Sequence, residues 1–374
     1  MSKIRILYFV DCLEHGGIQS LLWEIIKRLD KNEFEISILS FDFNRDYELE
    51  KVMTNMGVNI YKIPRPEKQP FKCLKMCKQI FKDNCFDVVH CHSSSKSAIV
   101  LKYAYKYNVK LRIVHAHSDH FQSSNVLKKI IGHILFIPTC RYANKYMACS
   151  KNAAKWMFKH FYAKKIEPII VNNAIDLSRF QYSKEYREDI RKMYNINDDT
   201  FVLGHIGRFV RVKNHLFLID IFNDLLKLKP NSKLIFVGDG ELLDKCKQKV
   251  NDLKINDKVI FAGYQSVTEK FYSAFDAFIL PSLYEGLPIV GVEAQASGLP
   301  CYFSNNITDS VNICSDNCHI VDIKKSSEDW AKIINKTKLN YERLKAIDVL
   351  SKVGFNINEV VNYLTELYKN NLKQ

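Results

Sequence analysis

Two glutamates lie in an otherwise uncharged and mostly apolar stretch of the sequence, LPSLYEGLPIVGVEAQASGLP (280–300). Seven residues separate Glu285 from Glu293. Two carboxyl groups placed in this way could form an acid–base pair, or they could be an ordinary loop acid and a helix-start acid. Glu285 follows a predicted strand, and we expect Glu293 at or near the first turn of the next helix, where the helix dipole favours an anion.

Two cations follow another predicted strand in the stretch GRFVRVKN (207–214). Arg208 can hold a diphosphate through two parallel hydrogen bonds, and Lys213 adds a point charge. The alternative is that both are ordinary surface charges. Because an apolar helix is predicted directly after this loop, the pattern favours a site for an anionic ligand.

Two glycine turns come after predicted strands. Gly16 and Gly17, in EHGGIQS (14–20), precede a predicted helix and would let backbone amides approach an anion. They lack the G-x-G-x-x-G spacing of a dinucleotide site, so a plain strand–helix turn is the alternative. The second turn, VGDGEL (237–242), is interpreted as turn chemistry and helix capping.

The histidine and cysteine patterns do not predict a metal site. His90 and His92 point the same way in an extended segment, but the sequence offers no evident third ligand. The 11 cysteines are odd in number and form no CxxC pair, so we expect reduced, buried thiols. No metal and no cofactor are predicted.

Positive charge is concentrated in the first half of the chain. Residues 1–180 have a net charge of +13 and residues 181–374 of +1, which together give the +14 of the whole chain. A basic half suits an anionic partner such as nucleic acid, anionic lipid or a phosphorylated substrate. Basic stripes interleaved with aromatic residues are missing, which argues against a nucleic-acid module.

Short apolar runs alternate with longer amphipathic runs along both halves of the 374 residues. This alternation predicts an α/β protein with two Rossmann-like, doubly wound parallel-sheet domains. The expected domains are residues 1–175 and 176–355, followed by a C-terminal helix in 356–374 that packs back on the N-terminal domain. Ligands of such sheets bind beyond the carboxyl ends of the strands, where the two glutamates, the two cations and the first glycine turn are all expected.

No run of about 18 apolar residues that could span a membrane is present, and the apolar start (residues 4–10) is interpreted as a buried strand rather than a secretory leader. The segment 125–146 combines apolar residues with Lys128, Lys129, Arg141 and Lys145. It is a candidate interfacial segment for an anionic membrane surface, with a core helix as the alternative.

The stretch LYEGLPIVGVEAQASGLP resembles the E-x7-E signature of retaining nucleotide-sugar glycosyltransferases of the family-4 type, which have the GT-B fold with two domains facing a central cleft. The motifs GG, VNNAIDLSRF (171–180) and GRFVRVKN follow in the order of that family. Asn214 departs from the family pattern, since a glycine is common there. The resemblance covers nearly the whole chain and points to enzymes of capsule, exopolysaccharide and O-antigen assembly.

The resemblance also implies roles for individual residues. Arg208 and Lys213 would hold the donor diphosphate, Glu293 the ribose hydroxyls, and Glu285 the sugar ring. His117, with His115 as its rival, would lie near the transferred sugar. The remaining donor-binding residues would be Gly16, Gly17, Gly286, Leu287, Pro288 and Ile289.

On this resemblance we expect transfer of a hexose or N-acetylhexosamine with retention, without a metal, from a UDP-sugar. The acceptor would be a glycan or a lipid-linked saccharide such as one on undecaprenyl diphosphate. The enzyme would be cytoplasmic and peripheral on the inner face of the cell membrane. The alternatives are an inactive sugar-nucleotide-binding partner and a non-hydrolysing nucleotide-sugar 2-epimerase. Sugar, linkage and oligomeric state stay open.

Overall fold

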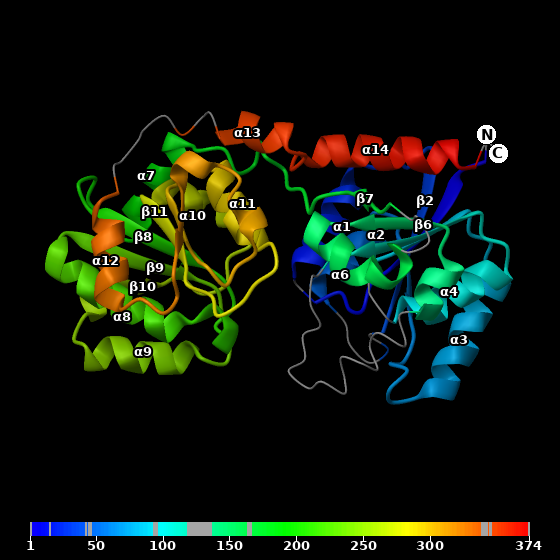
Figure 1. Ribbon diagram of the computed structural model, residues 1–374, viewed down its shortest axis with the longest axis horizontal. Coiled ribbons are helices and arrows are strands. Elements are labelled where there is room, and N and C mark those ends of the chain that lie inside the picture. Colours follow the sequence, from blue (N-terminus) through cyan, green and yellow to red (C-terminus); the bar gives the residue numbers. More distant parts are fainter. Residues whose placement is uncertain are drawn as a thin grey trace. The chain divides into compact units, whose positions relative to one another are not determined.

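The computed structural model describes residues 2–14, 16–41, 43, 47–92, 96–117, 137–162, 167–337, 343 and 346–372. The chain divides into two compact units (Figure 1). The N-terminal unit contains residues 1–174 together with the C-terminal segment 357–374, and the C-terminal unit contains residues 175–356.

The N-terminal unit is built on a seven-stranded parallel sheet with the order β3-β2-β1-β4-β5-β6-β7. The strands are β1 (Ile4–Phe9), β2 (Phe34–Ser40), β3 (Asn59–Lys62), β4 (Val88–Cys91), β5 (Leu111–Ala116), β6 (Lys145–Ala148) and β7 (Ile169–Ile170). Its helices are α1 (Gly17–Arg28), α2 (Glu48–Asn55), α3 (Pro70–Asp83), α4 (Ser97–Lys106), α6 (Lys151–Tyr162) and α14 (Ile357–Asn370).

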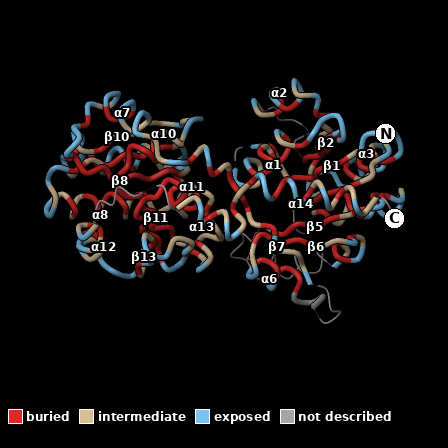
Figure 2. The backbone as a smooth tube through the Cα atoms, turned by 90° about the horizontal axis from the view of Figure 1, so that it is seen from above, coloured by how far each residue is buried: buried red, intermediate tan, exposed pale blue. Residues whose placement is uncertain are grey.

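Both faces of this sheet are buried, which explains the continuous apolar runs of its strands. In β1, Ile6 and Tyr8 point into one core and Leu7 and Phe9 into the other. The strands accordingly form the buried centre of the unit (Figure 2). Helix α14 returns to the first of these cores, where it packs beside α1 and buries Tyr368 (Figure 1).

The C-terminal unit has a six-stranded parallel sheet with the order β10-β9-β8-β11-β12-β13. The strands are β8 (Phe201–Ile206), β9 (Ser232–Val237), β10 (Val259–Phe261), β11 (Ala277–Leu280), β12 (Cys301–Ser304) and β13 (Cys318–Val321). Its helices are α7 (Lys184–Met193), α8 (His215–Leu228), α9 (Leu243–Asp252), α10 (Thr268–Ala274), α11 (Ile289–Ala296), α12 (Ser327–Asn335) and α13 (Ala346–Lys352).

Each sheet reverses its strand order at one place. The reversal lies between β1 and β4 in the N-terminal unit and between β8 and β11 in the C-terminal unit. In doubly wound sheets, ligands bind at such a switch point, beyond the carboxyl ends of the strands. The fold therefore directs attention to the loops that follow these four strands.

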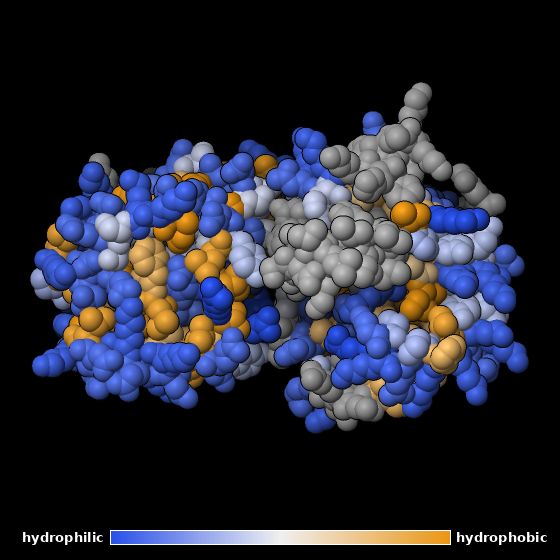
Figure 3. Space-filling model, turned by 60° about the horizontal axis from the view of Figure 1, so that its bottom comes forward, coloured by the Kyte–Doolittle hydropathy of each residue, from blue (hydrophilic) through white to orange (hydrophobic). Residues whose placement is uncertain are grey.

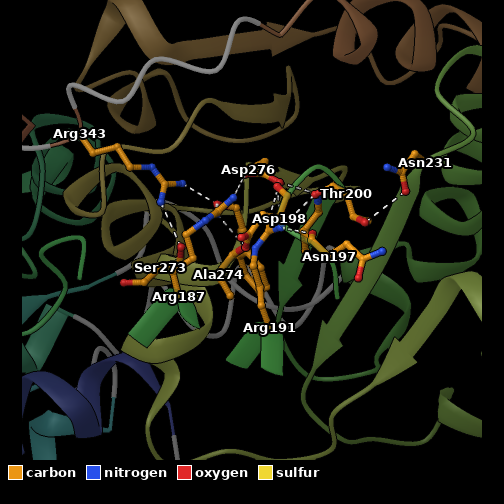
Figure 4. Close-up of polar contacts among 12 residues, drawn as sticks. Arg187, Arg191, Asn197, Asp198, Thr200, Asn231, Ser273, Ala274, Asp276 and Arg343 are labelled. Carbon is orange, nitrogen blue, oxygen red and sulfur yellow. Dashed lines mark hydrogen bonds and ion pairs between the residues drawn. The ribbon is translucent and has the colours of Figure 1, made fainter. Parts of the chain in front are cut away.

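A buried ion network fixes α7 to the C-terminal sheet (Figure 4). Asp276, which precedes β11, accepts hydrogen bonds from Arg187 and Arg191 of α7 at 2.8 and 2.7 Å and from the amide of Val202 at 2.7 Å. Arg343 donates to the carbonyl oxygens of Ser273 and Phe275. The carboxylate thus compensates cations that would be costly to bury alone.

None of the described helices is long and apolar enough to cross a membrane. On the face shown in Figure 3, apolar side chains of the described surface stand in separate groups among hydrophilic ones. The candidate interfacial segment 125–146 lies outside the described residues up to 136. Within its remainder, Arg141 is exposed and Lys145 is the first residue of β6.

Candidate donor-binding site

The loops after β8 and β11 meet at the switch point of the C-terminal sheet, because these two strands pair directly. The amide of Leu283 donates to the carbonyl oxygen of Val212 at 2.8 Å. The side-chain amide of Asn214 donates to the carbonyl oxygen of Pro281 at 3.1 Å. The cation-bearing loop and the loop that carries Glu285 are therefore joined by hydrogen bonds into one substructure.

A second loop supports the cation-bearing loop from behind. The amides of Gly207 and Phe209 donate to the carbonyl oxygens of Val237 and Asp239, both at 2.9 Å. Gly238 has a φ of +141°, and a Cβ at this position would lie 2.1 Å from the carbonyl oxygen of Gly207. The turn VGDG thus allows two backbones to approach closely, a function beyond the turn chemistry and capping expected from the sequence.

Lys213 and Glu285 form an ion pair at the junction of the two loops. Lys213 Nζ lies 2.6 Å from Glu285 Oε1, and the two side chains are 15% and 17% exposed. The hydroxyl of Ser282 donates to the same carboxylate oxygen at 3.2 Å. A diphosphate that binds the ammonium group competes with this carboxylate, so the two predicted site residues are coupled electrostatically.

Arg208 is the second residue after β8, at the start of the same loop. Its side chain is exposed, and among the described residues no ion-pair partner for it is found. Lys213 ends a 3₁₀ turn, Arg211–Lys213, and is followed by Asn214 in the left-handed conformation (φ 59°, ψ 40°). Asparagine tolerates this conformation, which explains how it can replace the glycine common at this position in the family that the sequence resembles.

The residues after Glu285 form a turn and then the start of α11. Pro288 is the N-cap residue of this helix and Ile289 its first residue, and no side chain caps the helix. Gly286 and Leu287 lie in the preceding turn and are partly exposed. The amide of Gly291 donates to the carbonyl oxygen of Pro288 at 2.9 Å, whereas the amides of Ile289 and Val290 have no acceptor within the helix. Such amides can bind phosphate or hydroxyl oxygens.

Glu293 is the fifth residue of α11 and so begins its second turn, next to the first turn at or near which it was expected. The helix dipole falls off within the first turn, and other groups hold this carboxyl. The hydroxyl of Tyr272 donates to Glu293 Oε2 at 2.7 Å. Burial raises the pKa of Glu293 to about 7, while Tyr272 and the charge of Arg179 act to lower it.

The predicted glycines of the N-terminal unit follow β1, one of the two strands at its switch point. Gly16 caps α1 with extended backbone (φ −173°), Gly17 is the first helical residue, and both are exposed. No side chain caps this helix either. A Cβ at Gly16 would meet Oε1 of Gln19 at 2.6 Å, and that side chain donates to the carbonyl oxygen of Cys12.

His115 and His117 differ in exposure. His117 is partly exposed, and His115 is buried. His117 Nδ1 lies 2.7 Å from Asn173 Oδ1 and its Nε2 lies 2.8 Å from His92 Nδ1, so both ring nitrogens are hydrogen-bonded. A sugar hydroxyl can reach a ring nitrogen of His117 only by exchanging one of these bonds.

Two residues that act on the candidate site were missed by the sequence analysis. Tyr272 precedes Glu293 by 21 residues, and no local pattern joins the two. Gln295 is buried in α11, donates to the carbonyl oxygen of Val311, and accepts from the amides of Ile313 and Cys314. The motif EAQ contains Gln295 but gives no hint of this bracing role.

Comparison with known families agrees with this arrangement. Residues 15–179 match the family described as Glycosyltransferase Family 4, and residues 186–348 match the family described as Glycosyl transferases group 1. The chain is a glycosyltransferase with the GT-B fold. The resemblance carried by the two glutamates and the GR…K loop is confirmed at this level.

Several relatives of this glycosyltransferase align over nearly their whole length. The capsular polysaccharide biosynthesis glycosyltransferase CapH of Staphylococcus aureus is 26% identical, with 98% of each chain covered. The UDP-Gal:alpha-D-GlcNAc-diphosphoundecaprenol alpha-1,3-galactosyltransferase of Escherichia coli is 25% identical, with 98% of this chain and 97% of that one covered. Among solved structures, Anabaena HepE in complex with UDP-glucose superposes with a TM-score of 0.78 at 17% identity, over 98% of this chain and 100% of the other.

Proposed function

We propose that this glycosyltransferase moves a hexose or N-acetylhexosamine, with retention of anomeric configuration, from a UDP-sugar to a lipid-linked or oligosaccharide acceptor. The product would belong to a bacterial surface polysaccharide. The observation that carries the proposal is the Lys213–Glu285 pair at the switch point, with Glu293 eight residues further along the chain in the second turn of α11. The names of CapH, the galactosyltransferase and the UDP-glucose complex support the choice of pathway, acceptor and nucleotide.

The chemistry asked of the site is stabilisation of a leaving group. Departure of UDP places negative charge on the phosphate oxygen that was bonded to the sugar. Lys213, Arg208 and the first amides of α11 are fixed positive groups that stabilise such charge where it develops. In the proposed reaction these groups do what a metal ion does in other transferases, so transfer is expected to be metal-independent.

The two glutamates have different tasks in this proposal. Glu293, held by Tyr272, accepts hydrogen bonds from the ribose hydroxyls. Glu285 contacts the sugar ring. When the donor diphosphate binds Lys213, the ion pair between Lys213 and Glu285 is broken. His117 approaches the sugar with a tautomer set by Asn173 and His92.

Transfer can be tested directly with the full-length protein. UDP- and GDP-sugars are first screened for thermal stabilisation, since a ligand at about 100 times its dissociation constant adds about 2.7 kcal/mol. The stabilising donor is then incubated with an undecaprenyl-diphosphate-linked saccharide, and the anomeric configuration of the product is determined by NMR. We expect a glycosylated lipid whose configuration matches the donor, and an inverted product would overturn the proposed mechanism.

Variants connect this reaction to the site. Lys213→Ala should abolish both transfer and donor hydrolysis, whereas Lys227→Ala, which removes a lysine paired with Asp224 on the exposed end of α8, should change neither. Stabilisation by a donor without any turnover would indicate an inactive binding partner. A donor sugar epimerised at C2 would indicate the epimerase.

The place of action that we propose is the inner face of the cell membrane. Helices α3 and α4 lie side by side (Figure 1) and expose Lys72, Lys75, Lys78, Lys82, Lys102 and Lys106, for which no acidic partner is found among the described residues. Phe71, at the start of α3, is 87% exposed. Lysines around an exposed aromatic side chain suit an anionic bilayer surface.

A further inference from the structure

Four histidines gather at the carboxyl ends of two neighbouring strands in the N-terminal unit. His90 and His92 belong to the end of β4, and His115 and His117 to the end of β5. Alternate residues of a strand face the same side, and the register sets His90 opposite Ile113, so the four rings share one face. Ring centroids are 4.2 Å apart for His90 and His92 and 5.3 Å for His92 and His115.

Three of these rings are buried, and each has one nitrogen close to a nitrogen of the other two. His90, His92 and His115 are between 0 and 3% exposed. One ring nitrogen from each lies within 4.8 Å of the other two, and His90 Nε2 is 3.3 Å from His115 Nδ1. Two imidazole nitrogens bound to one tetrahedral zinc ion are about 3.4 Å apart, so this pair already has a suitable separation.

The outward nitrogen of each ring has a hydrogen-bond partner. His90 Nδ1 lies 2.8 Å from the hydroxyl of Tyr368, His115 Nε2 3.3 Å from the carbonyl oxygen of Val171, and His92 Nδ1 2.8 Å from His117 Nε2. Metal-binding histidines almost always use the second nitrogen in this way, because the hydrogen bond fixes the tautomer and the ring orientation.

The inward nitrogen of His92 has no such partner. Its Nε2 atom is buried and makes no hydrogen bond with the described residues. Buried polar atoms are nearly always satisfied, and each exception needs an explanation. His92 stacks on His90, so its ring has to turn for both rings to point at one ion, and Nε2 has no hydrogen bond to lose when it does.

We propose that His90, His92 and His115 form a binding site for one first-row transition-metal ion of the Zn²⁺ class, with three nitrogen ligands and an open fourth position. Imidazole ligands suit Zn²⁺, Ni²⁺ and Cu²⁺. The hydrogen-bond partners of the outward nitrogens are a tyrosine hydroxyl, a backbone carbonyl and another imidazole, all uncharged. The ion therefore keeps its charge, which favours an anion or hydroxide as the fourth ligand.

The site belongs to the N-terminal unit and uses none of the residues assigned to the donor diphosphate. His92 of this site is hydrogen-bonded to His117, which the proposed function places near the sugar, and His115 was the other histidine considered there. The metal titration uses no sugar donor, so its failure and the failure of the proposed function are distinguishable.

The test is a metal titration of the full-length protein after treatment with a chelator. Co²⁺ binding is followed by visible absorption and Zn²⁺ binding by calorimetry, in a Cys85→Ser background that removes the exposed thiol. We expect one ion per chain and a cobalt spectrum without thiolate charge-transfer bands. His92→Asn should weaken binding roughly tenfold or more and should abolish the thermal stabilisation by Zn²⁺.

Two controls accompany this titration. His319→Asn removes an exposed histidine of the C-terminal unit, and Lys213→Ala removes a donor-site cation, so both should bind the metal as the parent does. Equal affinity in His92→Asn and the parent, binding without saturation, or a thiolate spectrum would overturn the proposal. Circular dichroism checks folding, and His115→Gln serves as the second variant if His92→Asn does not fold.

Discussion

Glu293 is a carboxyl group whose ionisation is opposed by its own surroundings. Burial raises its pKa from 4.5 to about 7. Between these two pH values the folded state binds more protons than the unfolded state, so the free energy of unfolding decreases as the pH rises through this window and stays lower above it. A residue that destabilises the fold at neutral pH is expected at a binding site.

The first prediction concerns this stability. Glu293→Gln keeps an acceptor for Tyr272 but cannot ionise, so it should stabilise the protein at pH 8 by on the order of 1–3 kcal/mol and have little effect at pH 4. Thermal unfolding of variant and parent at both pH values measures this difference. The same stabilisation at pH 4 and pH 8 would exclude ionisation as its cause.

The second prediction separates the roles of the two glutamates. Glu293→Gln should weaken UDP-sugar binding, and parent affinity should rise from pH 6 to pH 8 as the carboxylate forms. Glu285→Gln should change donor affinity by no more than a few-fold but should lower kcat, because the contact of Glu285 with the sugar ring acts mainly in the transition state, when the diphosphate departs. Calorimetry and initial rates measure the two effects. Equal loss of turnover with unchanged donor affinity in both variants would contradict this division.

The sequence indicated these residues singly but not their contacts. Lys213 and Glu285 were each placed after a strand, and the 2.6 Å ion pair between them follows only from the adjacency of β8 and β11. For the same reason the sequence offered His90 and His92 without the third histidine, since His115 reaches them across two paired strands.

At the scale of elements, two glycines allow the loop after β9 to lie against the loop after β8. A Cβ at Gly238 would lie 2.1 Å from the carbonyl oxygen of Gly207, and one at Gly240 would lie 2.8 Å from the backbone of Phe209. Gly263 also has a positive φ, of +68°, but nothing lies within 4 Å of its added Cβ. A substitution at Gly263 therefore introduces backbone strain alone, whereas one at Gly238 or Gly240 adds a steric clash with the neighbouring loop.

The third prediction follows from this comparison. Gly263→Ala should cost about 1 kcal/mol of unfolding free energy through backbone strain alone. Gly238→Ala should cost more and should also weaken UDP binding, because it displaces the loop that carries Arg208 and Lys213. Urea unfolding and UDP titration measure the two effects. Equal costs and unchanged UDP affinity would show that the contact between the loops does not shape the site.

Element order was predictable from the sequence, whereas element boundaries were less so. The alternation of apolar and amphipathic runs predicted two parallel α/β sheets, and the sheets are found. Helix α11 begins at Ile289, which moves Glu293 into the second turn. Pro288 caps the helix without a side-chain hydrogen bond, so the sequence around it has no capping pattern that would fix the first turn.

At the scale of the whole molecule, part of the positive charge of the first half of the chain lies on one exposed surface, formed by α3 and α4. Residues 1–180 have a net charge of +13, and part of this charge lies on the exposed lysines of α3 and α4. Lys75, Lys78 and Lys82 belong to one helix whose buried side is held in the core by Cys73, Cys77 and Phe81. The lysines can therefore be replaced without disturbing that core.

The last prediction tests whether this surface binds membranes. A triple Lys75, Lys78 and Lys82→Gln variant should lose most flotation with vesicles that contain phosphatidylglycerol, since each lysine near an anionic surface contributes about 1 kcal/mol. The matched control, Lys245, Lys247 and Lys254→Gln, removes the same charge from exposed positions of the C-terminal unit and should float like the parent.

Phe71→Ser should weaken flotation at high salt, where the apolar contribution remains after charges are screened. Equal losses in the two triple variants would mean that net charge alone draws the protein to the bilayer, and no flotation of the parent at low salt would exclude a membrane-binding surface on α3.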